Sequence, residues 1–123
     1  MSTAYLVVAL LAIAANAFSG VAAIVHLKPI IPAMARAGVP ESWLTFPIGT
    51  LKTAGAAGLL LGLAGVPLVG TAAAIGLVLF FVCAIYTHVR ASDYSPQFGL
   101  AIGFLLLAVA TLGLGLPSAL ERV

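Results

Sequence analysis

Four side chains in this sequence, His26, Lys52, His88 and Asp93, are of types that carry out general acid and base chemistry. Histidine exchanges its proton near neutral pH, and lysine or a carboxylate can do so when its surroundings change its pKa. Asp93 follows His88 by five residues, so it could orient that imidazole. We take these four as catalytic candidates. The alternatives are histidines that stabilise helix ends and, for Asp93, a solvated loop charge.

Five further residues are candidates for ligand binding. Asn16 is followed by Ser19, Ala23 and His26 at i+3, i+7 and i+10. This spacing predicts that the four residues share one helical face, and because they are polar or small we expect that face to point into the bundle. An alternative for Asn16 and Ser19 is hydrogen bonding that holds helices together. The other ligand-binding candidates flank the chain's apolar segments: Glu41, Trp43, Tyr86 and Arg90.

The composition indicates that a membrane protein positions these residues. Of 123 residues, 63% are hydrophobic and 7% are charged, and the mean hydropathy is +1.27. Soluble domains carry about 25% charged residues, so a cytosolic enzyme, a nucleic-acid partner and a secreted disulfide scaffold are excluded. The single cysteine, Cys83, rules out an internal disulfide and a CxxC motif, and no metal site is predicted.

The apolar segments predict four crossings. A helix of about 20 apolar residues spans the hydrocarbon core, and the uncharged stretch 53–87 is too long for one crossing, so it must break at Gly65-Val66-Pro67. We predict an all-α fold, an integral membrane four-transmembrane-helix bundle forming a single domain over residues 1–123. The expected spans are about 4–26, 47–64, 68–88 and 98–116.

Charge places most of the chemistry at one end of this bundle. Lys28, Arg36, Lys52 and Arg90 fall on one side and only Arg122 on the other. The positive-inside rule predicts that the first side is cytoplasmic and that both termini lie outside. The candidates other than Asn16 fall at this end as well. The connection 28–46, rich in proline, is expected to carry Trp43 at headgroup depth and to act as a lid or partner surface.

The length of the second span places Lys52 below the membrane surface. If Lys52 lay at the membrane surface, only 13 residues would remain before Ala64, too few to cross, so the helix must begin near Pro47. An ammonium at that depth usually faces a partner or cavity, with snorkelling as the alternative. The glycines at 58 and 62 form a GxxxG pattern that permits close helix contact and makes a homo-oligomer plausible.

Three segments together resemble the DoxX-like family of small bacterial four-helix membrane proteins. They are GTLKTAGAAGLL at 49–60, AIYTHVR at 84–90, and the proline-rich connection that follows His26. Many relatives carry Glu where this chain has Lys52. The family takes its name from a subunit associated with thiosulfate:quinone oxidoreduction. The resemblance therefore implies a four-helix fold, the bacterial cytoplasmic (inner) membrane and a link to membrane oxidoreductases.

Four functions follow from these observations. The first is an integral subunit of a membrane oxidoreductase system that binds a quinone or similar apolar small molecule through Lys52, His26 and His88. Its electrons must come from a redox partner protein or a bound cofactor. The second is a stand-alone enzyme, an isomerase, cyclase or epoxide-opening catalyst, that acts on a lipophilic substrate by acid and base catalysis. The third is haem held by His26 and His88, and the fourth is a purely structural protein.

Overall fold

Every regular element in the computed structural model is helical, among the residues it describes, which are 2–26, 28–66 and 68–121. The elements are α1 (Thr3–Ile24), α2 (Ile30–Arg36), η1 (Glu41–Leu44), η2 (Thr45–Gly49), α3 (Thr50–Leu63), α4 (Val69–Arg90) and α5 (Pro96–Glu121). Four helical stretches are long and apolar enough to cross a membrane: Thr3–Ile24, Glu41–Leu63, Val69–Arg90 and Pro96–Pro117. The predicted all-α bundle of four spans is confirmed.

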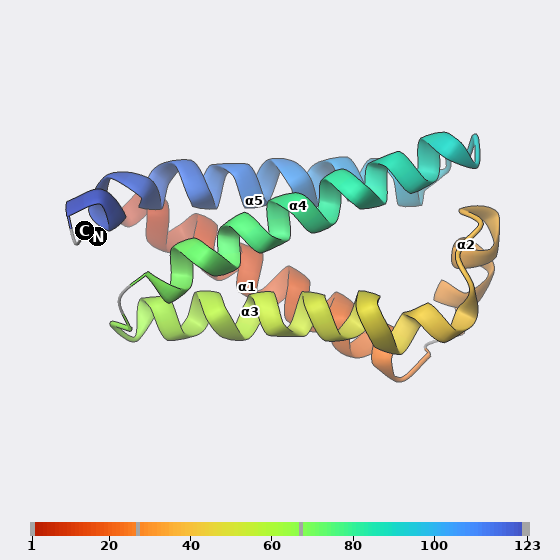
Figure 1. Cartoon of the computed structure of the whole chain (residues 1–123), viewed down its shortest axis with the longest axis horizontal. Helices are drawn as coiled ribbons and strands as arrows, with labels where there is room; N and C mark the ends of the chain where they lie inside the picture. The colour runs from red at the N-terminus through yellow and green to blue at the C-terminus, as the bar shows by residue number, and fades with distance from the viewer. Residues whose placement is uncertain (1, 27, 67, 122–123) are drawn as a thin grey trace.

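The four long helices form a closed ring. Helix α1 packs on α3, α3 on α4, α4 on α5, and α5 returns to α1. Helix α1 begins, and α5 ends, at one end of the bundle, whereas α2 lies at the opposite end (Figure 1). Large apolar side chains such as Phe18, Leu79 and Leu106 are exposed on the outside of the ring. That outer surface is suited to contact with lipid rather than water.

Side-chain size grows steadily along the contact between α3 and α4. A Cβ added at Gly62 would meet the backbone of Gly70, one at Gly58 would meet Ala73, and one at Gly55 would meet the side chain of Leu77. The helices are therefore closest near their connecting turn. Further along, the next α4 residue on this face is Phe81. Figure 1 shows α4 leaning away from α3 toward the end where α2 lies.

The segment between α1 and α3 folds into short helices. Helix α2 and η1 occupy the proline-rich connection, and Phe46 interrupts the helical path with an extended backbone (φ −142°, ψ 132°). His26 lies beyond the end of α1 and has a left-handed backbone (φ 53°). His26 is therefore not part of the α1 face on which its ten-residue spacing from Asn16 predicted it to lie.

Close backbone contact between α3 and α4 predicts unequal effects of two glycine substitutions. In Gly62→Ala the new Cβ would lie 2.7 Å from Gly70 Cα, a backbone atom that cannot yield without moving the helix. We expect the free energy of unfolding to fall by about 1–3 kcal/mol. Titration with a denaturing detergent measures this quantity.

The matched control is Gly103→Ala in α5, where nothing lies within 4 Å of the added Cβ. It should leave stability unchanged or raise it by up to about 1 kcal/mol, because alanine favours the helix over glycine. Equal losses in the two variants would contradict the packing described for the α3–α4 contact.

Candidate functional site

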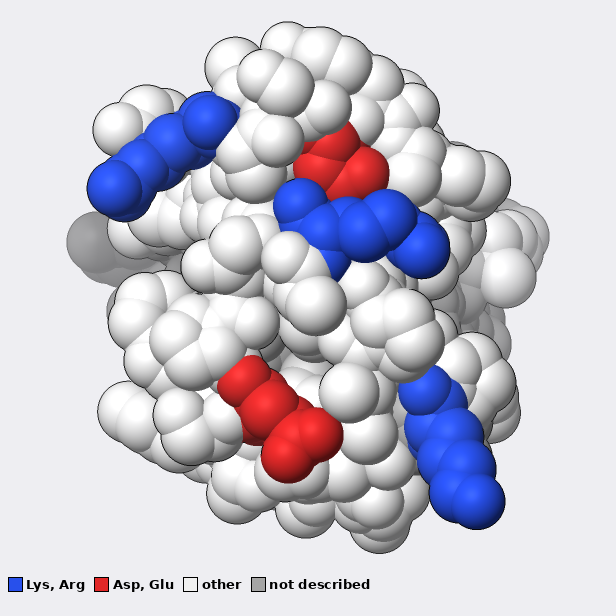
Figure 2. Space-filling model, turned by 90° about the vertical axis from the view of Figure 1, so that its right-hand side faces the viewer, with Lys and Arg blue, Asp and Glu red and all other residues white. Residues whose placement is uncertain are grey.

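Charged side chains gather at the end of the bundle where α2 lies (Figure 2). We call this the polar end. Lys28, Arg36, Glu41 and Arg90 are exposed, whereas Asp93 is buried in the turn between α4 and α5. A full charge in this region can reach water, which the apolar body of the bundle does not offer.

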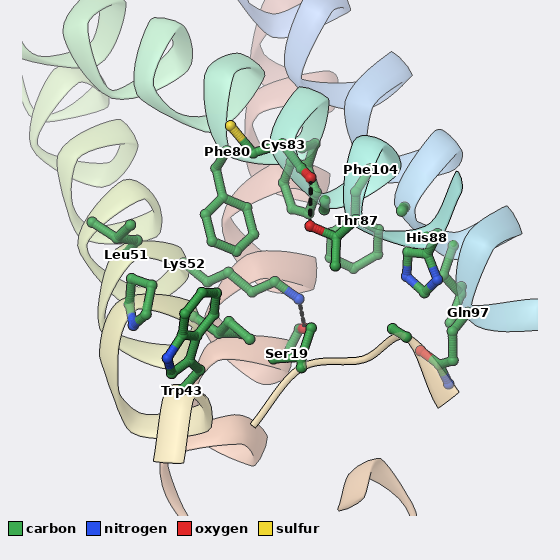
Figure 3. Close-up of a pocket in the computed structure, with 18 of the residues that line it drawn as sticks. Ser19, Trp43, Leu51, Lys52, Phe80, Cys83, Thr87, His88, Gln97 and Phe104 are labelled. Atoms are coloured by element: carbon green, nitrogen blue, oxygen red, sulfur yellow. Dashed lines mark hydrogen bonds between the residues drawn. The ribbon is translucent and has the colours of Figure 1, made fainter. Parts of the chain in front are cut away.

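A cavity of about 480 Å³ lies between the long helices near the polar end. Its wall is mostly apolar, and the segment from α2 to η1 contributes Met34, Ala37, Val39 and Trp43 to it. The polar groups on the wall come from every long helix (Figure 3): Ser19 of α1, Lys52 of α3, Thr87 and His88 of α4, and Gln97 of α5. The separation of α3 from α4 provides the space.

Lys52 reaches from α3 into this cavity (Figure 3). Its Nζ donates a hydrogen bond of 2.7 Å to Ser19 Oγ on α1. The same Nζ lies 5.9, 5.6 and 5.3 Å from the ring centroids of Phe80, Phe81 and Phe104. At these distances the face of an aromatic ring attracts a cation. Within the part of the chain that the structure describes, Lys52 forms no ion pair.

His88 is held by a carboxylate at the edge of the cavity. Its Nδ1 lies 3.0 Å from Asp93 Oδ2, and the other oxygen of Asp93 accepts a hydrogen bond of 3.2 Å from the backbone N–H of Ser95. The neighbouring Ser95 and then the His88 ring lower the pKa of the Asp93 carboxyl, although burial acts the other way.

The state of Asp93 decides the tautomer of His88. An ionised carboxylate only accepts hydrogen bonds, so Nδ1 of His88 must carry the proton that it donates to Asp93. In the neutral ring the lone pair is then on Nε2, which has no hydrogen-bond partner among the described residues. His88 lines the cavity, and this nitrogen is free to take a proton from a molecule bound there.

The structure brings only some of the candidates together. Lys52, His88 and Trp43 line the cavity, and Asp93 supports His88. His26 does not line it, and its Nε2 pairs with Thr45 Oγ1 at 3.1 Å. Asn16 is buried and donates to the Ala12 carbonyl of its own helix. The remaining candidates are exposed and lie outside the cavity wall: Glu41, Tyr86 and Arg90.

Sequence reasoning missed the aromatic surroundings of Lys52. Phe80 and Phe81 precede His88 by eight and seven residues, two helical turns, and this spacing could have placed them on the same side of α4. Phe104 and Gln97 carried no such signal because they lie on another helix. No three His, Cys, Asp or Glu side chains gather closely enough to hold a metal ion, among the residues searched.

The ring of four spans and its mostly apolar cavity define a multi-pass membrane protein with a cavity near one end. The family model described as the DoxX-like family matches residues 7–111. The chain therefore belongs to the DoxX-like family, as its sequence resemblance predicted. Comparisons with curated proteins and with solved structures found no match.

The lowered pKa of Asp93 predicts how stability depends on pH. The unfolded chain would bind a proton at this carboxyl before the folded chain does, so the stabilisation is complete above the ordinary pKa near 4 and is lost as the pH falls through the lower folded value. We expect the melting temperature in neutral detergent to drop as the pH falls below about 4, and Asp93→Asn to flatten that drop.

Glu41→Gln is the control, because Glu41 is an exposed carboxylate at the same end of the bundle. It should leave the pH profile of the melting temperature close to that of the wild type. A profile that Asp93→Asn does not alter would show that ionisation of the Asp93 carboxyl does not stabilise the folded protein.

Proposed function

We propose that this protein binds an apolar small molecule of the quinone type in the cavity near the polar end, as a subunit of a membrane oxidoreductase system in the bacterial cytoplasmic membrane. The observation that supports this is the presence of two proton-handling side chains, Lys52 and His88, on a mostly apolar wall. Binding sites for small molecules commonly have this character and enclose about 300–1,000 Å³, and the cavity lies in that range at about 480 Å³.

The residues of the cavity have separate tasks in this proposal. Lys52 donates a hydrogen bond to a ligand oxygen, and Trp43 and Phe80 flank an apolar ring. His88 accepts a proton at Nε2 or returns it, while Asp93 fixes the ring and stabilises its charged form. A bound quinone supplies two-electron, two-proton chemistry. The electrons come from a partner protein or a bound cofactor, since the chain has a single cysteine and no CxxC motif.

The proposed orientation directs this end toward the cytoplasm, with both termini outside. Lys28, Arg36 and Arg90 support it, because cytoplasmic flanks of membrane spans carry an excess of Lys and Arg. Protons that pass through His88 would then be exchanged with the cytoplasm.

Binding can be followed through Trp43, the single tryptophan of the chain, which lines the cavity. A short-tailed benzoquinone should quench Trp43 fluorescence saturably in protein embedded in lipid nanodiscs. Gly76 also lines the cavity, with nothing within 4 Å of an added Cβ. The bulk of Gly76→Leu should therefore fill the space and weaken binding by about tenfold or more.

Gly103→Leu provides the matched control, since an added Cβ at Gly103 is equally unobstructed and Gly103 is not part of the cavity wall. It should bind the benzoquinone like the wild type. Quenching that does not saturate, or that all three proteins share equally, would refute ligand binding in the cavity.

The buried His88–Asp93 pair supports a second candidate function, a stand-alone enzyme acting on a lipophilic substrate. In the opening of an epoxide, His88 would take a proton from the attacking water, and Lys52 would give one to the ring oxygen. A carboxylate that orients the base is a common arrangement for such chemistry. The net reaction adds one water to the epoxide and yields a diol.

Turnover of a lipophilic aryl epoxide tests this second candidate. His88→Asn should lower kcat by roughly 10²–10⁴, because it removes the general base. His26→Asn is the matched control, since His26 also lies at the polar end but not on the cavity wall. Wild-type rates in His88→Asn, or equal losses in both variants, would exclude His88 as the base.

A further inference from the structure

Lys52 carries a positive charge for which the described side chains supply no negative partner. Asp93 is engaged by His88 and Ser95. Glu41 is exposed and does not line the cavity. These are the acidic residues whose side chains the structure describes. A cation in an apolar bundle is normally paired, so the absence of a counterion among these residues requires an explanation.

The groups that do surround Lys52 compensate its charge only in part. The ammonium has three N–H donors, and Ser19 Oγ accepts one of them. The rings of Phe80, Phe81 and Phe104 attract the cation through their faces but carry no net charge. Two of the N–H donors and the full positive charge therefore have no partner among the described residues.

The rest of the cavity wall indicates what the uncharged part of an anionic ligand would be like. Leu51, Leu79, Phe80 and Leu100 give it a largely apolar surface. Leu79 and Leu100 are also exposed on the outside of the bundle, where lipid tails would lie. A small inorganic anion would neutralise Lys52 but leave this apolar wall uncovered. An amphiphile with an anionic head satisfies both parts of the site.

We infer that the molecule bound in this cavity carries an ionised acidic oxygen, a carboxylate or a phenolate, on an apolar body, and that Lys52 is its counterion. The inference rests on the proposed function in that the ligand occupies the same cavity. It narrows the ligand class, because among quinone-type molecules it selects those with an ionised hydroxyl group on the ring.

Two probes that differ in the charge of the head group test this inference. They are ω-bromoundecanoate and its methyl ester, whose bromine atoms quench tryptophan on contact and so report on Trp43. The protein is held in phosphatidylcholine nanodiscs, which carry no net charge, at about pH 7, where a carboxylate is ionised and a lysine ammonium keeps its proton. Lys52→Met should bind the carboxylate roughly tenfold to a hundredfold more weakly than the wild type does, and the ester equally well.

Lys52→Arg gives a second comparison that does not depend on the folding of Lys52→Met. It keeps the positive charge and should bind the carboxylate nearly as tightly as the wild type. If the carboxylate and the ester bind the wild type, Lys52→Arg and Lys52→Met alike, while Gly76→Leu weakens both, the charge inference is overturned and the cavity remains a ligand site. If Gly76→Leu changes the quenching by neither probe, the inference and the proposed function both fail.

Discussion

The ammonium of Lys52 sits in a helix that is otherwise apolar enough to cross a membrane, and each neighbouring long helix contributes to its surroundings. Ser19 from α1 accepts its hydrogen bond, Phe80 and Phe81 from α4 present ring faces to it, and Phe104 from α5 completes the group. An unpaired lysine costs about 2.5–3.5 kcal/mol at the centre of a membrane helix. These contacts offset that cost only while the ring of four helices is closed.

The space around this charge results from a gradient of side-chain size. Along α4, the residues that face α3 change from Gly70 through Ala73 to Leu77, and Phe81 follows on the same face. Small residues allow two helices to approach closely, and larger ones separate them. The pair is therefore joined tightly at its turn and opens toward the polar end. The same gradient of side-chain size that holds α3 and α4 together at their turn also leaves room for the cavity.

Features set by residues close together in the sequence could be predicted from it. Contacts between two helices that are far apart in the sequence could not. The four spans follow from length and hydropathy, and the contact of Asp93 with His88 follows from their spacing of five residues. Lys52 and Ser19 are 33 residues apart, and no local pattern relates them. Asn16 shows the converse, because its amide bonds to the carbonyl of Ala12 in its own helix instead of reaching the cavity.

The two ionisable side chains of the cavity wall, His88 and Lys52, lie at different depths in the bundle, and this difference bears on what each can do. His88 lies in the last turn of α4, near the charged end of the bundle, where its ring is buried and paired with Asp93. Lys52 lies deeper along the chain's hydrophobic span and is enclosed by rings, and the segment from α2 to η1 covers the cavity with Met34 and Trp43. A group that exchanges protons and a group that holds a fixed charge need these different surroundings. The site is thus better suited to fix a ligand at Lys52 and to move a proton at His88 than to the reverse.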